Sequence, residues 1–125
     1  MTLKELYGSI GGDYDQALRV LRIEKLIDKH IRRFPTNTIF ADMDGALKSM
    51  DANGLFESSH AMKGVCSNLG LVNIASLASE ISEEFRPGSP RTMTDQEVAE
   101  KVARIDALYE TAKEGIRKYE SELNG

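Results

Sequence analysis

The chain has no tryptophan, one cysteine and three prolines among its 125 residues. With Cys66 alone, no disulfide can form within the chain, and this cysteine usage is typical of proteins from a reducing compartment. No apolar run approaches the roughly 18 residues that a membrane-spanning helix needs. The opening segment MTLKELYGSIGGDYD lacks the basic and apolar zones of a signal peptide. The sequence therefore predicts a cytoplasmic protein without a membrane partner.

Positive charge is also scarce. Sixteen Lys and Arg stand against twenty Asp and Glu, which gives a net charge of −4 at pH 7. Proteins that bind nucleic acid usually carry a basic surface, so no nucleic-acid partner is expected, although net charge does not describe local patches. Hydrophobic residues make up 41% of the chain and charged residues 29%, as in ordinary globular domains. We predict a single domain over residues 1–125.

Strand patterns are absent as well, because no segment alternates apolar and polar residues with a period of two. Helical periodicity covers the chain instead. Short connections, such as DANG at residues 51–54, which we interpret as a turn, favour antiparallel neighbours. We predict an all-α fold, with short N-terminal helices within residues 1–36 and an up-down-up-down antiparallel four-helix bundle over residues 37–125. The four bundle helices are expected at about 38–51, 54–69, 72–85 and 95–122.

Capping residues indicate where several helices begin and end. Capping boxes at Thr2–Glu5 and Thr94–Glu97 predict the starts of the first and last helices. Asp13 is expected to cap the start of the second helix. Gly70 is expected to cap the end of the helix at about residues 54–69. Pro35 marks the end of the third, because the residue before proline avoids the helical region.

The last helix repeats apolar residues in alternating steps of four and three, which is typical of a seam between packed helices. Such heptads also suit a coiled-coil dimer, but packing within the bundle is the simpler use, so we expect a monomer. The seam contains Val98, Val102, Ile105, Tyr109, Ala112, Ile116, Tyr119 and Leu123.

The helix at about 54–69 carries a distinctive polar face. His60, Lys63, Gly64 and Ser67 fall at i, i+3, i+4 and i+7, so they lie on one side of a helix. This side is away from the apolar stripe, so His60 is expected to be exposed. Glycine inside a helix costs about 1 kcal/mol relative to alanine, so the missing side chain of Gly64 should have a use. The apolar stripe contains Leu55, Met62, Val65, Cys66 and Leu69.

These residue types suit phosphoryl chemistry. A neutral imidazole is a good nucleophile toward phosphorus, and a reference pKa of about 6.5 leaves it mostly neutral at cellular pH. Lys63 would offset the charge of a phosphoryl group on His60, and Ser67 would donate a hydrogen bond further along. Gly64 would leave room for that group or for a partner's loops. The alternatives are that His60 and Lys63 are ordinary surface residues and that Gly64 permits close helix packing.

Phe56 lies one turn before His60, shifted toward the side of Lys63. It is a candidate for a partly exposed contact in partner docking, and the alternative is that it packs on a neighbouring helix. His30 is interpreted as a structural or boundary residue, because no lysine-glycine pair follows it. Asp42 and Asp44 are expected to point to different helix faces and to be solvated. The two histidines and one cysteine have no metal-site spacing.

The segment HAMKGVCSNLG, residues 60–70, resembles the phosphorylation-site helix of histidine-containing phosphotransfer (HPt) domains of bacterial two-component phosphorelays. The family pattern is H-x-L-K-G followed by L-G, and Met62 replaces its leucine. The preceding LFESSH and the N-terminal GGDYDQALRVL also fit. The resemblance is strong over about residues 54–82 and weaker over most of the remaining chain. The matching residues are His60, Lys63, Gly64, Leu69 and Gly70.

The resemblance implies that His60 accepts a phosphoryl group from a receiver-domain aspartate or from a histidine kinase and passes it on. It further implies that Mg²⁺ and most catalytic groups belong to the partner's receiver domain, so this chain needs no cofactor. The chain has neither a P-loop motif nor a glycine-rich kinase-like loop, which favours a phosphocarrier over an autonomous enzyme.

Two other functions stay open. One is a helical-bundle protein-interaction module that is not phosphorylated, and the intact His60–Lys63–Gly64 triplet favours the carrier over it. The other is the phosphoacceptor portion of a larger histidine kinase. Met1 and the lack of kinase motifs favour a free-standing protein.

Overall fold

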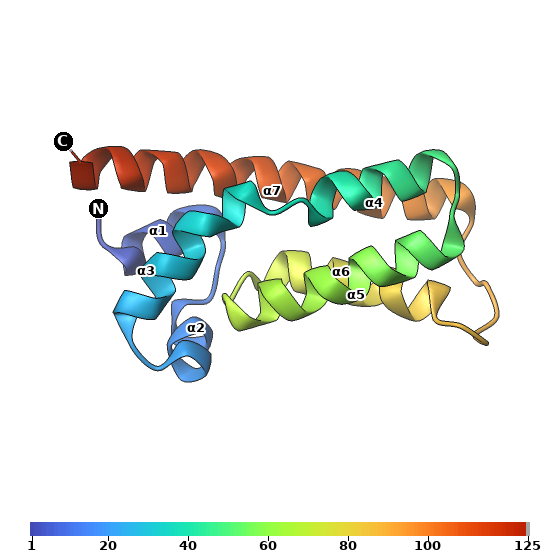
Figure 1. The fold of residues 1–125 in the computed structure, drawn as a ribbon, viewed down its shortest axis with the longest axis horizontal. Helices are drawn as coiled ribbons and strands as arrows, with labels where there is room; N and C mark the ends of the chain where they lie inside the picture. Colours follow the sequence, from blue (N-terminus) through green and yellow to red (C-terminus); the bar gives the residue numbers. More distant parts are fainter. Residues whose placement is uncertain (125) are drawn as a thin grey trace.

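The computed structural model describes residues 1–124, and all regular secondary structure in these residues is helical, without a strand (Figure 1). The all-α prediction is confirmed. None of the helices in this part of the chain has the length and apolar character of a membrane span. The elements are α1 (Leu3–Ile10), α2 (Tyr14–Leu21), α3 (Glu24–Arg33), the 3₁₀ helix η1 (Phe34–Thr36), α4 (Ile39–Lys48), α5 (Ala52–Asn68), α6 (Val72–Phe85) and α7 (Asp95–Asn124).

The four helices α4 to α7 surround the main core. Helix α5 packs most extensively against α6 and also against α4, while α7 packs against both α6 and α4. The chain reverses at the three connections around residues 49–51, 69–71 and 86–94 (Figure 1). The inward residues are almost entirely apolar, as expected for helices that stay together by burying one face. They include Met43, Leu55, Met62, Ile81, Val98, Val102 and Ile105.

Helices α1 to α3 lie at the end of the molecule where both termini are found (Figure 1). Helix α1 packs on α7, and α2 packs on α5. The buried Tyr7 donates its hydroxyl hydrogen bond to the Leu69 carbonyl at 2.7 Å, and the Asp13 amide donates to the Gly70 carbonyl at 2.7 Å. The N-terminal helices are therefore fixed to the connection between α5 and α6.

Gly70 is required at that contact for two reasons. Its φ of +71° lies in the left-handed region, and a Cβ there would come 2.2 Å from the Asp13 carbonyl oxygen. The amide of Gly70 donates to Ser67, and that of Leu71 donates to Cys66, which closes the last turn of α5. The prediction that Gly70 ends this helix is confirmed.

The predicted helix starts are also found. Thr2 and Glu5 form a capping box, the Asp13 side chain accepts from the Gln16 amide, and Thr94 and Glu97 bond reciprocally. The third helix ends as expected near Pro35, although a 3₁₀ turn continues through the proline.

Two sequence-based expectations about helix ends are wrong. The DANG segment is not a turn, because the Asp51 carboxylate caps the Gly54 amide at 3.1 Å and draws Ala52–Gly54 into the first turn of α5. The reversal falls earlier, at Ser49 and Met50, with Met50 at a φ of +48°. Leu123 was expected to belong to the packed seam of α7, but the buried part of the seam ends at Tyr119, and Leu123 is 50% exposed.

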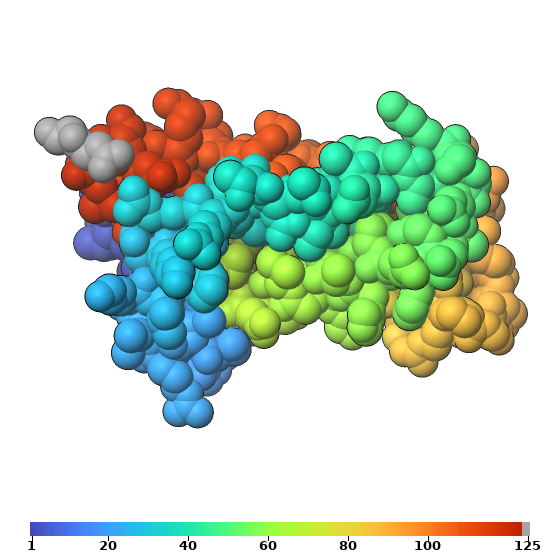
Figure 2. All heavy atoms as spheres, viewed as in Figure 1, coloured from blue at the N-terminus to red at the C-terminus, as the bar shows by residue number. Residues whose placement is uncertain are grey.

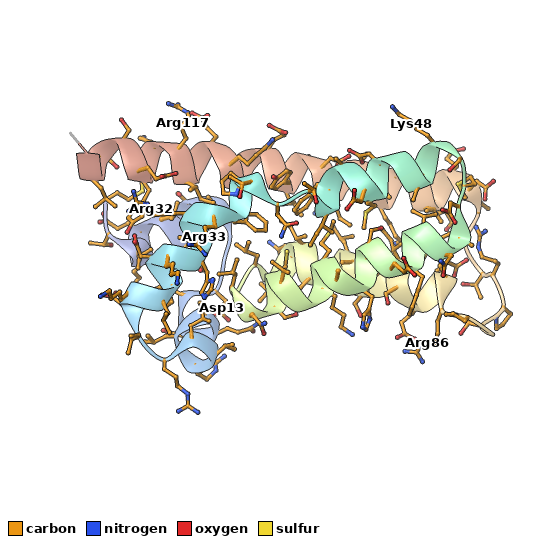
Figure 3. All side chains as sticks on the ribbon, in the orientation of Figure 1. Asp13, Arg32, Arg33, Lys48, Arg86 and Arg117 are labelled. Carbon is orange, nitrogen blue, oxygen red and sulfur yellow. The ribbon has the colours of Figure 1, made fainter. Side chains whose placement is uncertain are left out.

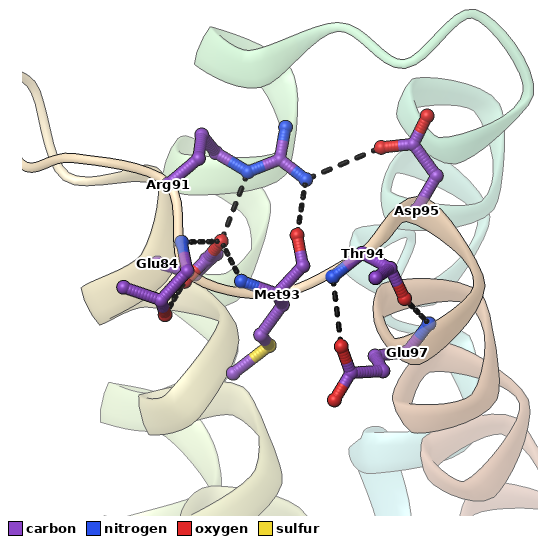
Figure 4. A network of polar contacts seen from close by, with 7 residues as sticks. Glu84, Arg91, Met93, Thr94, Asp95 and Glu97 are labelled. Carbon is purple, nitrogen blue, oxygen red and sulfur yellow. Dashed lines mark hydrogen bonds and ion pairs between the residues drawn. The ribbon is translucent and has the colours of Figure 1, made fainter.

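A carboxylate fixes the long connection between α6 and α7 (Figure 4). Glu84 is buried and accepts hydrogen bonds from the Thr92 amide at 2.8 Å, the Met93 amide at 2.7 Å and Arg91 Nε at 2.9 Å. The Thr92 hydroxyl also donates to it at 2.8 Å. Burial alone would raise the pKa of Glu84, but these hydrogen bonds outweigh it and lower the pKa to about 2.

Candidate functional site

The candidate site lies on the outer surface of α5. The inward face of this helix is formed by Leu55, Met62 and Cys66 together with Ser58 and Ser59, which are also buried. The Ser58 hydroxyl donates to the Gly54 carbonyl at 2.7 Å, and the Ser59 hydroxyl donates to the Phe56 carbonyl at 3.1 Å. Because both hydroxyls bond within their own helix, they pack inward without an unsatisfied group. His60 follows directly and points outward.

His60 is exposed, as the helical wheel predicts. Its imidazole stacks on the Phe56 ring one turn earlier, with ring centroids 5.6 Å apart and an angle of 20° between the planes. Within the part of the chain that the structure describes, neither ring nitrogen makes a hydrogen bond. The stacking therefore limits rotation of the imidazole while both nitrogens stay accessible to a partner.

Phe56 was expected either to be a partly exposed docking contact or to pack on a neighbouring helix, and the structure has features of both. It is half-buried and packs against the core, and the same ring covers one face of the His60 imidazole. A contact of this kind at i and i+4 is expected on a helix surface. Whether Phe56 also contacts a partner stays a prediction.

Lys63 lies one turn beyond His60 and is exposed. Among residues 1–123, no carboxylate forms an ion pair with it, so its charge is available near the imidazole. Gly64 is exposed as well, and a Cβ built on it would have no atom within 4 Å. No helix of this chain packs there, so the alternative that Gly64 permits close helix packing is excluded within the described structure. The missing side chain leaves open space beside His60.

Ser67 is half-buried at the far end of this face. Its carbonyl oxygen accepts a hydrogen bond of 2.8 Å from Gln16 Nε2 of α2. Its hydroxyl is without a hydrogen-bond partner in residues 1–123. The structure thus brings His60, Lys63, Gly64 and Ser67 onto one face and joins the end of that face to the N-terminal helices.

Burial changes the titration of two groups that lie outside this face, Cys66 and Asp106. Cys66 is fully buried, as its place on the apolar stripe predicts, and burial raises the pKa of its thiol to about 12, so the thiol is unreactive. Asp42 is exposed, but Asp44 is half-buried on α4 and faces Asp106 of α7. Burial, together with the hydrogen bond and charge of Asp44, raises the pKa of Asp106 to about 7.

The expectation that Asp44 is merely solvated is therefore wrong. Sequence reasoning considered only the spacing within one helix, whereas the partner carboxylate comes from α7. The position of Asp106 next to the seam residue Ile105 is the only signal in the sequence that could have indicated this contact. In residues 1–124, no three His, Cys, Asp or Glu side chains are grouped as a metal site requires.

A known protein family matches this part of the chain. The family model described as "Hpt domain" matches residues 36–115, which include α4 to α6, most of α7 and every residue of the candidate site. Residues 1–35, with α1 to α3, lie outside the match. No curated protein and no solved structure was found to match the chain.

Proposed function

The chain belongs to the Hpt domain family, and on that premise we propose that His60 is a phosphoacceptor in a phosphorelay. A carrier role in phosphotransfer follows from the family. The finer proposal is that His60 takes a phosphoryl group from a receiver-domain aspartate or from a histidine kinase and passes it on. The observation that carries it is the exposed imidazole of His60, inside the matched region, with both ring nitrogens unengaged by the described residues.

The transfer is a displacement at phosphorus. The unprotonated nitrogen of the neutral imidazole attacks the phosphorus of an aspartyl phosphate on the partner. An N–P bond forms, the P–O bond to the aspartate breaks, and the carboxylate leaves with its electron pair. The other ring nitrogen keeps its proton. The onward transfer reverses these steps: the aspartate of a second receiver attacks the phosphorus, the N–P bond breaks, and the neutral imidazole of His60 is released.

Neighbouring residues support this step in different ways. Lys63 lies one turn from His60, so its positive charge offsets the negative charge that the imidazole gains on phosphorylation. No described carboxylate pairs with Lys63 and competes for that charge. Gly64 leaves space for the phosphoryl group and for the loops of the partner. Ser67 supplies a hydroxyl that is free to donate, and Phe56 holds the imidazole plane and offers an apolar edge for docking.

The remaining chemistry is assigned to the partner. We propose that Mg²⁺ is held by the receiver domain and that this chain acts as a phosphocarrier without its own cofactor. We further propose that it works as a monomer, with α4 to α7 as an up-down-up-down antiparallel bundle and α1 to α3 as part of the same domain. The single cysteine supports a cytoplasmic setting.

Labelling of an acceptor variant tests this proposal. We expect His60→Gln to abolish acid-labile, alkali-stable phosphorylation and to leave the helical circular-dichroism signal unchanged, because His60 is exposed and contributes little to the core. With phosphoramidate as a small donor that needs no docking surface, His30→Gln, at the other histidine of the chain, is the control and should be labelled like the natural protein. Full labelling of the His60 variant would refute the assignment. Absence of label from the natural protein would favour a protein-interaction module.

A further inference from the structure

Positive charge gathers in α2 and α3 although the chain as a whole is acidic. Residues 19–33, which we call the basic corner, contain six of the sixteen Lys and Arg and only two acidic residues. One of the two, Glu24, accepts a hydrogen bond from Tyr14, and the other, Asp28, pairs with Arg32. The remaining cations of the corner are exposed and form no ion pair with described residues. They are Arg19, Arg22, Lys25, Lys29 and Arg33.

Apolar side chains are exposed at the same corner. Val20, Ile23 and Leu26 are 45%, 53% and 37% exposed, and they are three of the four large exposed hydrophobic residues described in the chain. Arg22 has a φ of +75°, in a region that residues other than glycine rarely adopt, and it makes the sharp turn between α2 and α3. The space-filling view shows this corner projecting from the body of the molecule (Figure 2). Exposed apolar and basic groups together indicate a surface that binds a partner.

A pocket of about 310 Å³ opens beside the corner, between α3 and the second half of α5. Its apolar part includes Phe34, Leu21 and Val65, and its polar part includes Arg33, His30 and Asn68. Arg33 lies on α3 where that helix faces the body of the molecule (Figure 3). No Asp or Glu side chain is among the described residues that line the pocket. The pocket therefore combines an apolar interior with a rim that favours negative charge.

The pocket is held at a fixed place relative to His60. Val65 and Asn68 follow His60 by five and eight residues on the same helix, or about 8 and 12 Å along its axis. The Gln16–Ser67 hydrogen bond ties α2 to this end of α5. Helices α2 and α3 lie outside the region that the family model matches, whereas Asn37, Val65, Asn68 and Leu69 of the pocket lie inside it.

We propose that the pocket and the basic corner form a second docking contact for the receiver domain that exchanges phosphoryl groups with His60. The contact accepts an acidic surface segment of that receiver with one protruding apolar side chain. The proposal rests on the proposed function of His60. Asn68, at the rim of the pocket, is about 12 Å along α5 from His60, and a receiver domain of about 100 residues, with a radius of gyration of about 13 Å, can cover both. Opposite charges across the contact would speed association and select the partner.

A protein fits these features better than a lipid surface. A flat membrane would touch the projecting residues Val20, Ile23 and Leu26 but would leave the pocket beside α5 unfilled. An acidic protein segment fills the pocket and neutralises Arg33 and the nearby cations at once. The two sources of negative charge are separated by the experiment below.

Charge reversal in the pocket tests the proposal. The probe is a receiver domain that transfers phosphoryl groups to the natural protein, and its dissociation constant is measured at low and at high salt. We expect Arg33→Glu to raise the dissociation constant about tenfold or more at low salt and to weaken its salt dependence. Arg104→Glu is the matched control, because Arg104 is an exposed arginine on α7 that no described carboxylate pairs with. It should leave the dissociation constant unchanged.

A small donor separates docking from chemistry. Phosphoramidate needs no docking surface, so it should phosphorylate His60 equally in the natural protein and in both variants. Equal weakening of receiver binding by Arg33→Glu and Arg104→Glu, or no weakening by either, would overturn the pocket while leaving His60 as acceptor. If His60 accepts phosphate from neither source, the proposed function itself fails, and this inference with it. Binding of phosphatidylglycerol vesicles that Arg33→Glu abolishes, with receiver binding unchanged, would assign the surface to lipid instead.

Discussion

At the scale of single residues, Gly64 gives the sharpest separation of function from stability. Its Cβ position faces open space, so a side chain there meets nothing within the described chain. A helical glycine without a packing role lowers helix stability by about 1 kcal/mol relative to alanine. That it stands beside an exposed His60 and Lys63 is explained if a partner or a phosphoryl group needs the space.

We expect Gly64→Gln to slow phosphotransfer from a receiver at least tenfold and to raise the free energy of unfolding by up to about 1 kcal/mol. The longer side chain blocks the approach to His60 but strengthens the helix. Gly8→Gln is the matched control, because Gly8 is also helical with nothing within 4 Å of its Cβ position, yet lies on α1. It should gain similar stability and keep its transfer rate. Loss of stability with an unchanged rate in the Gly64 variant would show that the steric argument is wrong.

At the scale of elements, Glu84 decides how α6 joins α7. Its four hydrogen bonds to the 91–93 segment fix the connection directly before the capping box of α7. We expect Glu84→Gln to lower the free energy of unfolding by about 2–3 kcal/mol, because the amide group cannot accept from all of these donors and loses the charge that faces Arg91. Chemical denaturation at pH 7 measures this, and Glu83→Gln, at an exposed neighbour, should change little.

The pH dependence of this contact has a definite sign. The pKa of Glu84 is about 2 in the folded protein and 4.5 as its ordinary value, so the folded state favours the ionised form. The stabilisation is fully present above pH 4.5 and is lost as the pH falls toward 2. A Glu84→Gln variant whose stability falls as steeply as that of the natural protein over this range would contradict the assignment.

The contact between α4 and α7 behaves in the opposite way. Asp106 has a pKa raised to about 7 from an ordinary value of 3.8, so the folded state favours its protonated form. The folded protein binds the proton more tightly, and stability therefore falls as the pH rises from about 4 to about 7. We expect Asp106→Asn to remove this fall and to stabilise the protein at pH 8 by on the order of 1 kcal/mol after solvent screening. Thermal unfolding at pH 5 and pH 8 measures both effects.

Asp42→Asn is a suitable control for Asp106→Asn, because Asp42 is an exposed carboxylate of the same α4–α7 pair of helices. It should leave the difference in stability between pH 5 and pH 8 unchanged. If the natural protein is equally stable at pH 5 and pH 8, the pKa of Asp106 is not raised by its contact with Asp44, and the prediction is wrong.

At the scale of the whole molecule, the sequence predicts what depends on neighbours along the chain. The capping boxes at Thr2 and Thr94, the turn glycine Gly70 and the outward direction of His60 all follow from spacings of a few residues. Even the stacking of Phe56 on His60 is an i, i+4 contact that a helical wheel contains.

Contacts between distant segments were not predictable in the same way. Glu84 meets the 91–93 loop, Asp44 meets Asp106, and the pocket joins α3 to α5. Each depends on the three-dimensional arrangement of helices, for which sequence periodicity gives the buried face but not the facing residue. The prediction of a turn at DANG was wrong for a related reason. Asp51 could begin a turn, but its carboxylate instead caps the start of α5.

The central claim is that the phosphoryl group resides on His60, and mapping its position on the natural protein tests this most directly. The protein is incubated with a phosphorylated receiver domain and Mg²⁺, kept at alkaline pH, digested and analysed by tandem mass spectrometry. The account predicts one phosphoryl group, on the imidazole of His60, in the peptide that contains Phe56. A phosphoryl group on His30 or on another residue, or its retention by every receiver tested, would contradict the account.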